Sequence, residues 1–415
     1  MELSAPLLQL AVRALDLTLE FKRPADAVLS AFFRENRALG ARDRAFVAEA
    51  VFGVLRRYRY LCQVTPSAEP RVLIVAWLLK MRGMSGTALG KFVKPELIQH
   101  IRDADTRDLP LPVAAELPDW VVDRLRATST DADILALGRA LQQPAPLDLR
   151  VNVLKAERDA VLARLRADGL AAEATPYSPW GVRLQGHPAI NRHPLFLDGS
   201  VEEQDEGSQL LALLVGPRRG EMVGDFCAGA GGKTLALGAA MASTGRLYAF
   251  DVAEKRLANL KPRLARSGLS NVMPQRIASE NDARVKRLAG KLDRVLVDAP
   301  CSGLGTLRRN PDLKFRQSPA SVEALTRQQA SILRAAARLL KPGGRLVYAT
   351  CSILAEENEA IVEGLLAEGD FELEPAGAIL AQHRIALATG TCLKLSPAVH
   401  ATDGFFAAAL TRKTA

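Results

Sequence analysis

The chain of 415 residues exceeds what one ordinary hydrophobic core accommodates, so two or three domains are expected. Hydrophobic residues make up 48% and charged residues 24%, as in a globular protein, and no apolar run reaches the roughly 18 residues of a membrane span. Lys and Arg total 55 against 46 Asp and Glu, and the formal charge of +9 would attract a polyanion such as a nucleic acid. Since the first residues also lack the positive charge of a secretory signal, we expect a cytoplasmic protein without membrane contact.

The first 140 residues predict an all-α domain. Ser4 is placed to cap a helix that carries apolar residues on one face as far as Leu19, and Pro24 opens a second helix. A third helix follows Ala41 and ends in the alternating basic and aromatic run 56–60. Such a run suits RNA phosphates and stacked bases, but it equally suits a solvated helix end.

A proline-containing linker ends this domain, and a small α+β unit is predicted over 145–206. Its expected elements are a strand at 147–154, a helix at 158–167, and strands near 181–184 and 201–202. From residue 207 to 415, strands, glycine turns and helices alternate. Alternation of that kind indicates a parallel sheet covered by helices.

A glycine-rich loop joins the first strand of this region, 222–225, to a helix. The loop reads Phe226-Cys227-Ala228-Gly229-Ala230-Gly231-Gly232-Lys233-Thr234. Its glycines let a ligand approach the backbone, and the helix start offers free N–H groups. The next strand ends at Asp251, about 20 residues beyond the loop, where an acid can bind the ribose hydroxyls of a nucleoside cofactor.

The same loop also suggests a P-loop nucleotide-binding protein. Gly232-Lys233-Thr234 matches the end of the P-loop pattern, and the strand 294–298 ends in an acid that could hold magnesium. The full pattern requires glycine where Cys227 stands, and it leaves the segment after Asp298 unexplained. The P-loop is therefore the weaker alternative.

The five cysteines are Cys62, Cys227, Cys301, Cys351 and Cys392. An odd, scattered set argues against a disulfide framework and fits a reducing compartment. Because no Cys-x-x-Cys pair or Cys/His cluster occurs, no metal site is expected.

Two of these cysteines follow strands, Cys301 after 294–298 and Cys351 after 345–349, so both are expected at the carboxyl edge of the sheet. A thiolate adds well to carbon 6 of a pyrimidine, which prepares carbon 5 to accept a methyl group. Asp298 could hydrogen-bond the ring N3 and the amino group of the base, and Pro300 could shape the pocket wall. The target base should be single-stranded or flipped out of its helix. This chemistry does not tell which cysteine attacks.

These segments together resemble the Nol1/Nop2/Sun family of RNA cytosine-5 methyltransferases. The resemblance covers the chain from residue 147 onward and rests on three motifs, at 225–233, 298–314 and 348–352. It implies an α/β fold in which a Rossmann-like class I methyltransferase sheet (207–415) is joined by a small α+β connecting subdomain (145–206) to the all-α N-terminal domain (1–140). The N-terminal domain looks like the NusB-like RNA-binding domain of the bacterial Sun/Fmu branch, which modifies small-subunit ribosomal RNA.

The resemblance also implies roles for individual residues. It makes Cys351 the attacking thiolate and Cys301 the residue that assists product release. Asp298 is the third predicted catalytic residue, because of its expected hydrogen bonds to the base. The residues implied to contact S-adenosyl-L-methionine are Cys227, Ala228, Gly229, Ala230, Gly231, Gly232, Lys233, Asp251 and Asp298. The residues implied to contact RNA are Lys233, Arg308, Arg309 and Lys314, and Pro300 is expected to contact RNA from the wall of the base pocket. Transfer RNA is the competing substrate, a non-catalytic RNA-binding assembly factor is a competing class, and a monomer is expected.

Overall fold

The computed structural model describes residues 3–414, and the chain divides into two compact units with separate cores. The first unit covers Met1–Pro144 together with Thr306–Pro319. The second covers Ala145–Gly305 and Ala320–Ala415. The boundary expected near residue 140 does not account for the segment Thr306–Pro319. This segment comes from the C-terminal half of the sequence but belongs to the first unit.

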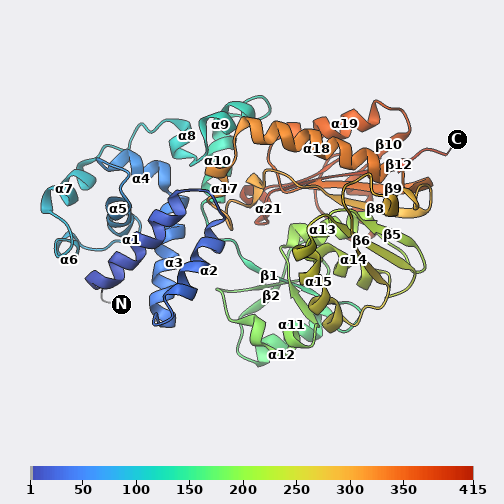
Figure 1. Cartoon of the computed structure of the whole chain (residues 1–415), viewed down its shortest axis with the longest axis horizontal. Coiled ribbons are helices and arrows are strands. Elements are labelled where there is room, and N and C mark those ends of the chain that lie inside the picture. The colour runs from blue at the N-terminus through green and yellow to red at the C-terminus, as the bar shows by residue number, and fades with distance from the viewer. Residues whose placement is uncertain (1–2, 415) are drawn as a thin grey trace. The chain divides into compact units, whose positions relative to one another are not determined.

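The first unit is helical because its apolar residues recur at helical spacing and face one another (Figure 1). Its helices are α1 (Ala5–Leu19), α2 (Ala25–Glu35), α3 (Ala41–Arg56), α4 (Tyr58–Val64), α5 (Pro70–Lys80), α6 (Gly86–Leu89), α7 (Pro95–Asp103), α8 (Leu111–Ala114), α9 (Asp119–Leu125), α10 (Asp131–Leu141) and α17 (Leu313–Arg316). The Ser4 side chain caps α1 by accepting from the Leu7 N–H at 3.3 Å, as predicted. The prediction of an all-α N-terminal region is confirmed.

The segment Thr306–Pro319 is bound into this helical unit by buried polar and aromatic contacts. Lys314 forms an ion pair with Glu116 at 3.2 Å, and the two side chains are 3% and 1% exposed. The Asp312 carboxylate accepts from the Ala25 N–H at 3.3 Å, and the Phe315 ring lies 4.8 Å from that of Phe21. These partners lie far apart in sequence, so no local pattern marks the segment as part of the helical unit.

The second unit begins with a four-stranded antiparallel sheet of order β2-β3-β1-β4. Its strands are β1 (Leu147–Val151), β2 (Ala172–Ala174), β3 (Gly181–Leu184) and β4 (Val201–Glu203), and its helices are α11 (Arg158–Ala167), α12 (Pro194–Leu197) and the 3-10 turn η1 (Ile190–Arg192). Leu149 and Val182 are opposed in the register and buried with Leu165 of α11. This small sheet-and-helix unit has the α+β composition that its sequence predicts.

The main sheet of the second unit has the order β10-β12-β9-β8-β5-β6-β7, with β11 paired to β12. Its strands are β5 (Met222–Asp225), β6 (Arg246–Asp251), β7 (Val272–Arg276), β8 (Leu292–Asp298), β9 (Leu340–Thr350), β10 (Phe371–Glu374), β11 (Leu393–Leu395) and β12 (Phe405–Arg412). The remaining elements are α13 (Glu206–Val215), α14 (Gly232–Ala240), α15 (Glu254–Ser267), α16 (Ala283–Lys286), α18 (Pro319–Ala337), α19 (Glu359–Leu366), α20 (Ala376–Gln382), α21 (Pro397–His400), η2 (Leu304–Thr306) and η3 (Ala355–Glu357). Strands β5 to β9 are parallel as predicted, but β12 runs antiparallel to β9 and β10.

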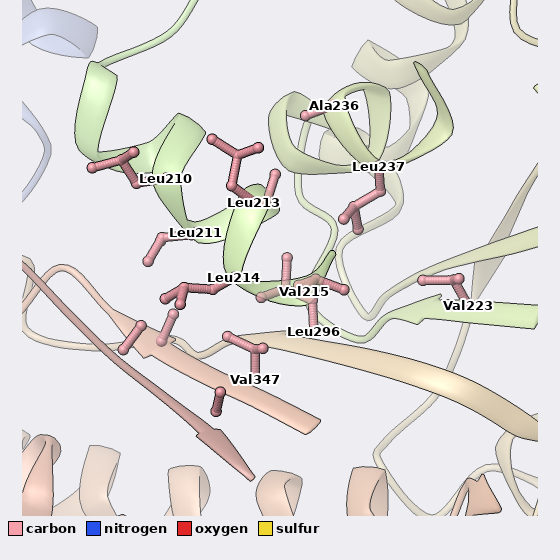
Figure 2. Close-up of a cluster of buried hydrophobic side chains, with 14 of the residues drawn as sticks. Leu210, Leu211, Leu213, Leu214, Val215, Val223, Ala236, Leu237, Leu296 and Val347 are labelled. Carbon is pink, nitrogen blue, oxygen red and sulfur yellow. The ribbon is translucent and has the colours of Figure 1, made fainter. Parts of the chain in front are cut away.

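Helices cover both faces of this sheet, with α13 and α14 on one face and α18 and α19 on the other (Figure 1). Side chains of β8 alternate accordingly, because Leu296 packs with α13 while Val295 and Val297 pack on the face of α18. Figure 2 shows the first cluster, in which Leu211 and Leu214 of α13 point toward the strands that carry Leu296 and Val347. Burial on both faces explains why these strands are continuously apolar in the sequence. Each fully buried Leu or Val contributes roughly 1.5–3 kcal/mol.

Candidate active site

A pocket of about 580 Å³ lies at the carboxyl ends of β5, β6, β8 and β9 in the second unit. The strand order reverses between β5 and β8, and open α/β sheets bind ligands at such a reversal. All the residues predicted to contact the cofactor line this pocket except Gly231. Pro300, Cys301 and Cys351 line it as well. The structure thus brings residues from four strand ends to one cavity.

The glycine loop takes its shape from two left-handed glycines. Gly229 has φ +56° and Gly231 has φ +84°, a region in which L side chains are strained. Gly231 is absent from the pocket wall because it backs onto the core, where an added Cβ would lie 2.1 Å from Leu260 Cδ1. The role of Gly231 is therefore to let the loop pack closely on α15, while its neighbours face the cavity.

Asp251 holds the loop from the end of β6. Its carboxylate accepts from the Gly229 N–H and from the Ala253 N–H, both at 2.7 Å, and the residue is 6% exposed. Each carboxylate oxygen retains a further lone pair in the pocket wall. Asp251 can thus fix the loop and still accept hydrogen bonds from a ligand.

Asp225, at the end of β5, presents a buried oxygen without a partner. Its Oδ2 accepts from the Thr234 hydroxyl at 2.7 Å, whereas Oδ1 has no hydrogen bond within the described part of the chain. Burial raises the pKa of this carboxyl to about 7. Asp225 lines the pocket, and a ligand that carries positive charge would favour the ionised form of its carboxyl group.

The arrangement of Thr234 and Lys233 argues against the P-loop alternative. In a P-loop the hydroxyl must reach magnesium and the lysine must reach phosphates. Thr234 is fully buried and its hydroxyl donates to Asp225, while Lys233 is paired with Asp298. Both side chains are therefore engaged with acids of the sheet.

Lys233 and Asp298 form an ion pair in the pocket wall. The Lys233 Nζ lies 2.7 Å from Asp298 Oδ2, and the two side chains are 13% and 31% exposed. Burial works to lower the pKa of Lys233, but the charge of Asp298 and its hydrogen bond outweigh burial and leave that pKa raised. Lys233 therefore keeps a positive charge beside the two cysteines, where it favours negative charge on sulfur.

The two predicted catalytic cysteines lie together. Their sulfur atoms are 3.4 Å apart, and the Cys351 N–H also points to Cys301 Sγ at 3.4 Å. The hydrogen bond with Cys351 and burial raise the pKa of Cys301 well above its usual value. Cys301 is thus a thiol that can donate its proton toward the sulfur of Cys351. Such a pair suits one sulfur that attacks and a second that handles protons.

Two of the basic residues after Cys301 are buried in the free protein. Lys314 is buried against Glu116 and its pKa is lowered by that burial, and Arg308 is 5% exposed. Arg309 is half-buried. Contact of Lys314, Arg308 and Arg309 with RNA phosphates therefore stays a prediction, and the burial of Lys314 is explained by its ion pair with Glu116.

The run at 56–60 is also engaged within its own unit. Arg57 donates to Gln142 and stacks over Tyr60 at 4.6 Å, and Arg59 pairs with Asp119 at 2.9 Å. These arginines are therefore paired within the helical unit rather than fully solvated, and RNA binding by this run stays a prediction.

Several pocket residues were not predicted. After the third strand of the sheet, Glu280 lies in the pocket wall, while Asp282 caps α16. Gln204 lies in the wall and binds Arg150, whose guanidinium also donates to the Gly232 carbonyl at 2.6 Å. Glu357 lies outside the pocket wall, is fully buried and belongs to none of the three sequence motifs. These residues act across long sequence separations, so spacing alone does not reveal them.

Two further searches cover residues 3–414. In that range no three His, Cys, Asp or Glu side chains lie close enough together to hold a metal ion. In the same range no helix combines the length and apolar character needed to cross a membrane.

The reversed parallel sheet, the glycine loop and an acid after the second strand define a class I S-adenosylmethionine-dependent methyltransferase. Family models agree, since that of "16S rRNA methyltransferase RsmB/F" matches residues 212–411 and that of the RsmF/B-like ferredoxin-like domain matches 117–191. The chain is 33% identical to the probable ribosomal RNA small subunit methyltransferase B of Synechocystis sp., over 91% of this chain and 93% of the relative. The chain belongs to the RsmB/F methyltransferase family.

Solved structures share this architecture. A methyltransferase homologue from Pyrococcus horikoshii is 30% identical, with a TM-score of 0.58, over 71% of this chain and 100% of that one. The structure of NSun6 from Pyrococcus horikoshii with SFG is 20% identical, with a TM-score of 0.64, over 72% and 99% of the two chains, and shows the same fold. The resemblance to the Sun family inferred from the motifs is thereby confirmed.

The pocket suits S-adenosylmethionine, the cofactor of this class. The cofactor carries a sulfonium and an ammonium group, and their positive charge would favour the ionised form of Asp225 in the pocket wall. The backbone of the glycine loop leaves room for close approach, since a Cβ added at Gly229 would meet nothing within 4 Å. Asp251 stands where the ribose hydroxyls of a nucleoside are bound in related folds.

Proposed function

We propose that this protein methylates carbon 5 of a cytosine in small-subunit ribosomal RNA, and that Cys351 forms a covalent bond to carbon 6 of the base during the reaction. The observation that carries this proposal is the pair of sulfur atoms 3.4 Å apart at the wall of the cofactor pocket. Ribosomal RNA is favoured because the similar relative from Synechocystis carries that substrate in its name.

In the first step the Cys351 thiolate attacks carbon 6, and the S–C6 bond forms as the C5–C6 double bond opens. Lys233 supports the thiolate with its positive charge. The Asp298 carboxylate, which is paired with Lys233 in the free protein, can accept a hydrogen bond from the amino group of the base and so help to hold the ring in place. Bound S-adenosylmethionine supplies the methyl group that carbon 5 acquires.

In the second step carbon 5 loses its proton, the C5–C6 double bond re-forms and the S–C6 bond breaks, restoring the Cys351 thiolate. We assign the proton acceptance to Cys301. The first cause of its raised pKa is its hydrogen bond with Cys351. Because Cys351 carries no thiolate while bound to carbon 6, its hydrogen bond no longer holds the proton on Cys301. Cys301 then releases that proton to solvent, and the resulting Cys301 thiolate accepts the proton from carbon 5. The raised pKa in the free protein and the role in release are then compatible.

The substrate is tested by incubating the full-length protein with S-adenosylmethionine and RNA from cells that lack it, and measuring methylated nucleosides in separate RNA fractions. We expect 5-methylcytosine in small-subunit ribosomal RNA. Product only in transfer RNA would keep the chemistry and overturn the substrate. Cofactor binding without methylation of naked RNA or of small subunits would favour a non-catalytic assembly factor.

The two thiols are distinguished by single variants. Cys301→Ala should accumulate a covalent protein–RNA complex on a denaturing gel, because release is blocked after addition. The double variant Cys301→Ala/Cys351→Ala should show no complex. Free turnover by Cys301→Ala would remove the release role assigned to Cys301.

A further inference from the structure

We propose that Glu357 is a positioning residue that holds the two cysteine-bearing loops together and thereby sets the separation of the reacting sulfur atoms. This inference rests on the proposed function, in which both thiols serve one reaction. Glu357 ends the 3-10 turn η3, is fully buried and lies outside the pocket wall, so it acts through other residues.

One carboxylate binds both loops directly. The Ser302 N–H donates to Glu357 Oε1 at 2.8 Å, and the Ser302 hydroxyl donates to Oε2 at 2.5 Å. The Ser352 hydroxyl donates to the same Oε2. Ser302 directly follows Cys301, and Ser352 directly follows Cys351. Each cysteine is therefore followed directly by a serine that is hydrogen-bonded to Glu357, and consecutive Cα atoms lie about 3.8 Å apart.

The carboxylate acts where the regular ladder of the sheet has ended. The last parallel register pair of β8 and β9 is Asp298 with Ala349, and the Ala299 N–H still donates to the Ala349 carbonyl at 2.9 Å. Beyond that bond a backbone bond joins the loops, from the Gly305 N–H to the Cys351 carbonyl at 2.8 Å, and Glu357 adds side-chain bonds to both loops. A third anchor comes from α18, where Gln329 donates to Glu357 at 3.0 Å and to the Pro300 carbonyl at 2.9 Å.

Glu357 is itself held in place. The Tyr348 hydroxyl donates to the Glu357 carbonyl at 2.6 Å, and Asn358 donates to the Ser352 carbonyl at 3.2 Å. A buried carboxylate that accepts several hydrogen bonds in fixed geometry transmits small displacements to all its partners. Loss of the carboxylate should therefore separate the loops and lengthen the sulfur–sulfur distance without removing any group that touches a substrate.

The test measures thiol proximity and activity separately. Diamide, a diazene oxidant, takes up two hydrogens as two nearby thiols become a disulfide, and peptide mass spectrometry follows the Cys301–Cys351 bond without RNA or cofactor. We expect Glu357→Ala to form this disulfide at least tenfold more slowly than the natural protein. Single-turnover methylation should fall at least tenfold, while the Kd for S-adenosylmethionine changes less than twofold.

Glu357→Gln provides the conservative rescue, since its oxygen can accept from Ser302 and Gln329 while its amide donates to the two hydroxyls. It should recover the disulfide rate to within threefold. Glu363→Ala, an exposed acid on α19, is the matched control and should equal the natural protein. If Glu357→Ala loses cofactor binding through misfolding, Ser352→Ala decides. It removes the hydroxyl that donates to Glu357, accepts from the Leu354 N–H and contacts the Ser302 hydroxyl, while the carboxylate stays, and it should slow the disulfide two- to fivefold.

Disulfide formation at the natural rate in Glu357→Ala, or in Ser352→Ala if the former misfolds, would overturn the positioning role. A natural protein that forms the disulfide quickly but methylates no RNA would instead refute the proposed function and leave the role of Glu357 in spacing the thiols intact.

Discussion

Replacing Gly231 by alanine should destabilise the second unit strongly. Gly231 has φ +84°, which costs an L residue about 1–2 kcal/mol. Its added Cβ would also lie 2.1 Å from Leu260 Cδ1, and Leu260 is fully buried, so the core must shift at a typical cost of about 1–3 kcal/mol. The two effects together predict a loss of about 2–5 kcal/mol in the free energy of unfolding and a weaker Kd for S-adenosylmethionine.

Alanine substitutions at two nearby glycines distinguish the effect of backbone strain from the effect of the steric clash. Gly229→Ala meets nothing within 4 Å but has φ +56°, so it should cost only the backbone term of about 1–2 kcal/mol. Gly232→Ala has its nearest neighbour at 3.7 Å at the start of α14 and should stay within about 0.5 kcal/mol of the natural protein. Urea denaturation and cofactor titration of all three variants give the comparison. A Gly231→Ala protein as stable as Gly232→Ala would refute the close packing of the loop on α15.

Three further predictions concern charge. A cationic cofactor favours the ionised form of Asp225, and the pKa of that carboxyl is about 7. The affinity for S-adenosylmethionine, measured by calorimetry, should therefore rise as the pH increases from 6 and level off above 7. In Asp225→Asn the affinity should not change over this pH range. Glu116→Gln leaves buried Lys314 without its counter-ion and should cost about 3–5 kcal/mol in denaturation experiments. Asp119→Asn breaks the ion pair between Arg59 and the exposed Asp119 and should cost less than about 1 kcal/mol. If Glu116→Gln and Asp119→Asn destabilised the protein equally, the burial of the Lys314–Glu116 pair would be contradicted. Lys233→Met should slow single-turnover methylation by about 100-fold, and an unchanged rate would remove its support of the thiolate.

The position of the pocket at the carboxyl edge of the sheet was predictable because it depends on which residues directly follow each strand. A parallel strand delivers the next residue to one edge of the sheet, so strands ending before the glycine loop, Asp251, Cys301 and Cys351 had to meet there. Residues of the glycine loop, Asp251, Cys301 and Cys351 all line one pocket. The antiparallel direction of β12 was not predicted, since a strand's own residues do not record which neighbours it pairs with.

The basic loop after Cys301 shows where sequence reasoning stopped. Lys314 and Glu116 are 198 residues apart, and nothing in either local pattern announces their ion pair. A cluster of positive side chains looks the same in a sequence whether it faces RNA or a buried acid. Glu357 was not predicted because its hydrogen-bond partners Ser302 and Gln329 lie 55 and 28 residues away in the sequence, beyond the reach of any local pattern.

The chemistry is tested most directly by RNA that contains 5-fluorocytidine in place of cytidine, because fluorine at carbon 5 cannot leave as a proton and release is blocked. Incubation with S-adenosylmethionine, nuclease digestion and peptide mass spectrometry then locate the adduct. The account predicts a methylated 5-fluorocytidine nucleotide bonded to Cys351 and no such complex with Cys351→Ala. An adduct on Cys301, or 5-methylcytosine made at the normal rate by Cys351→Ala, would contradict it.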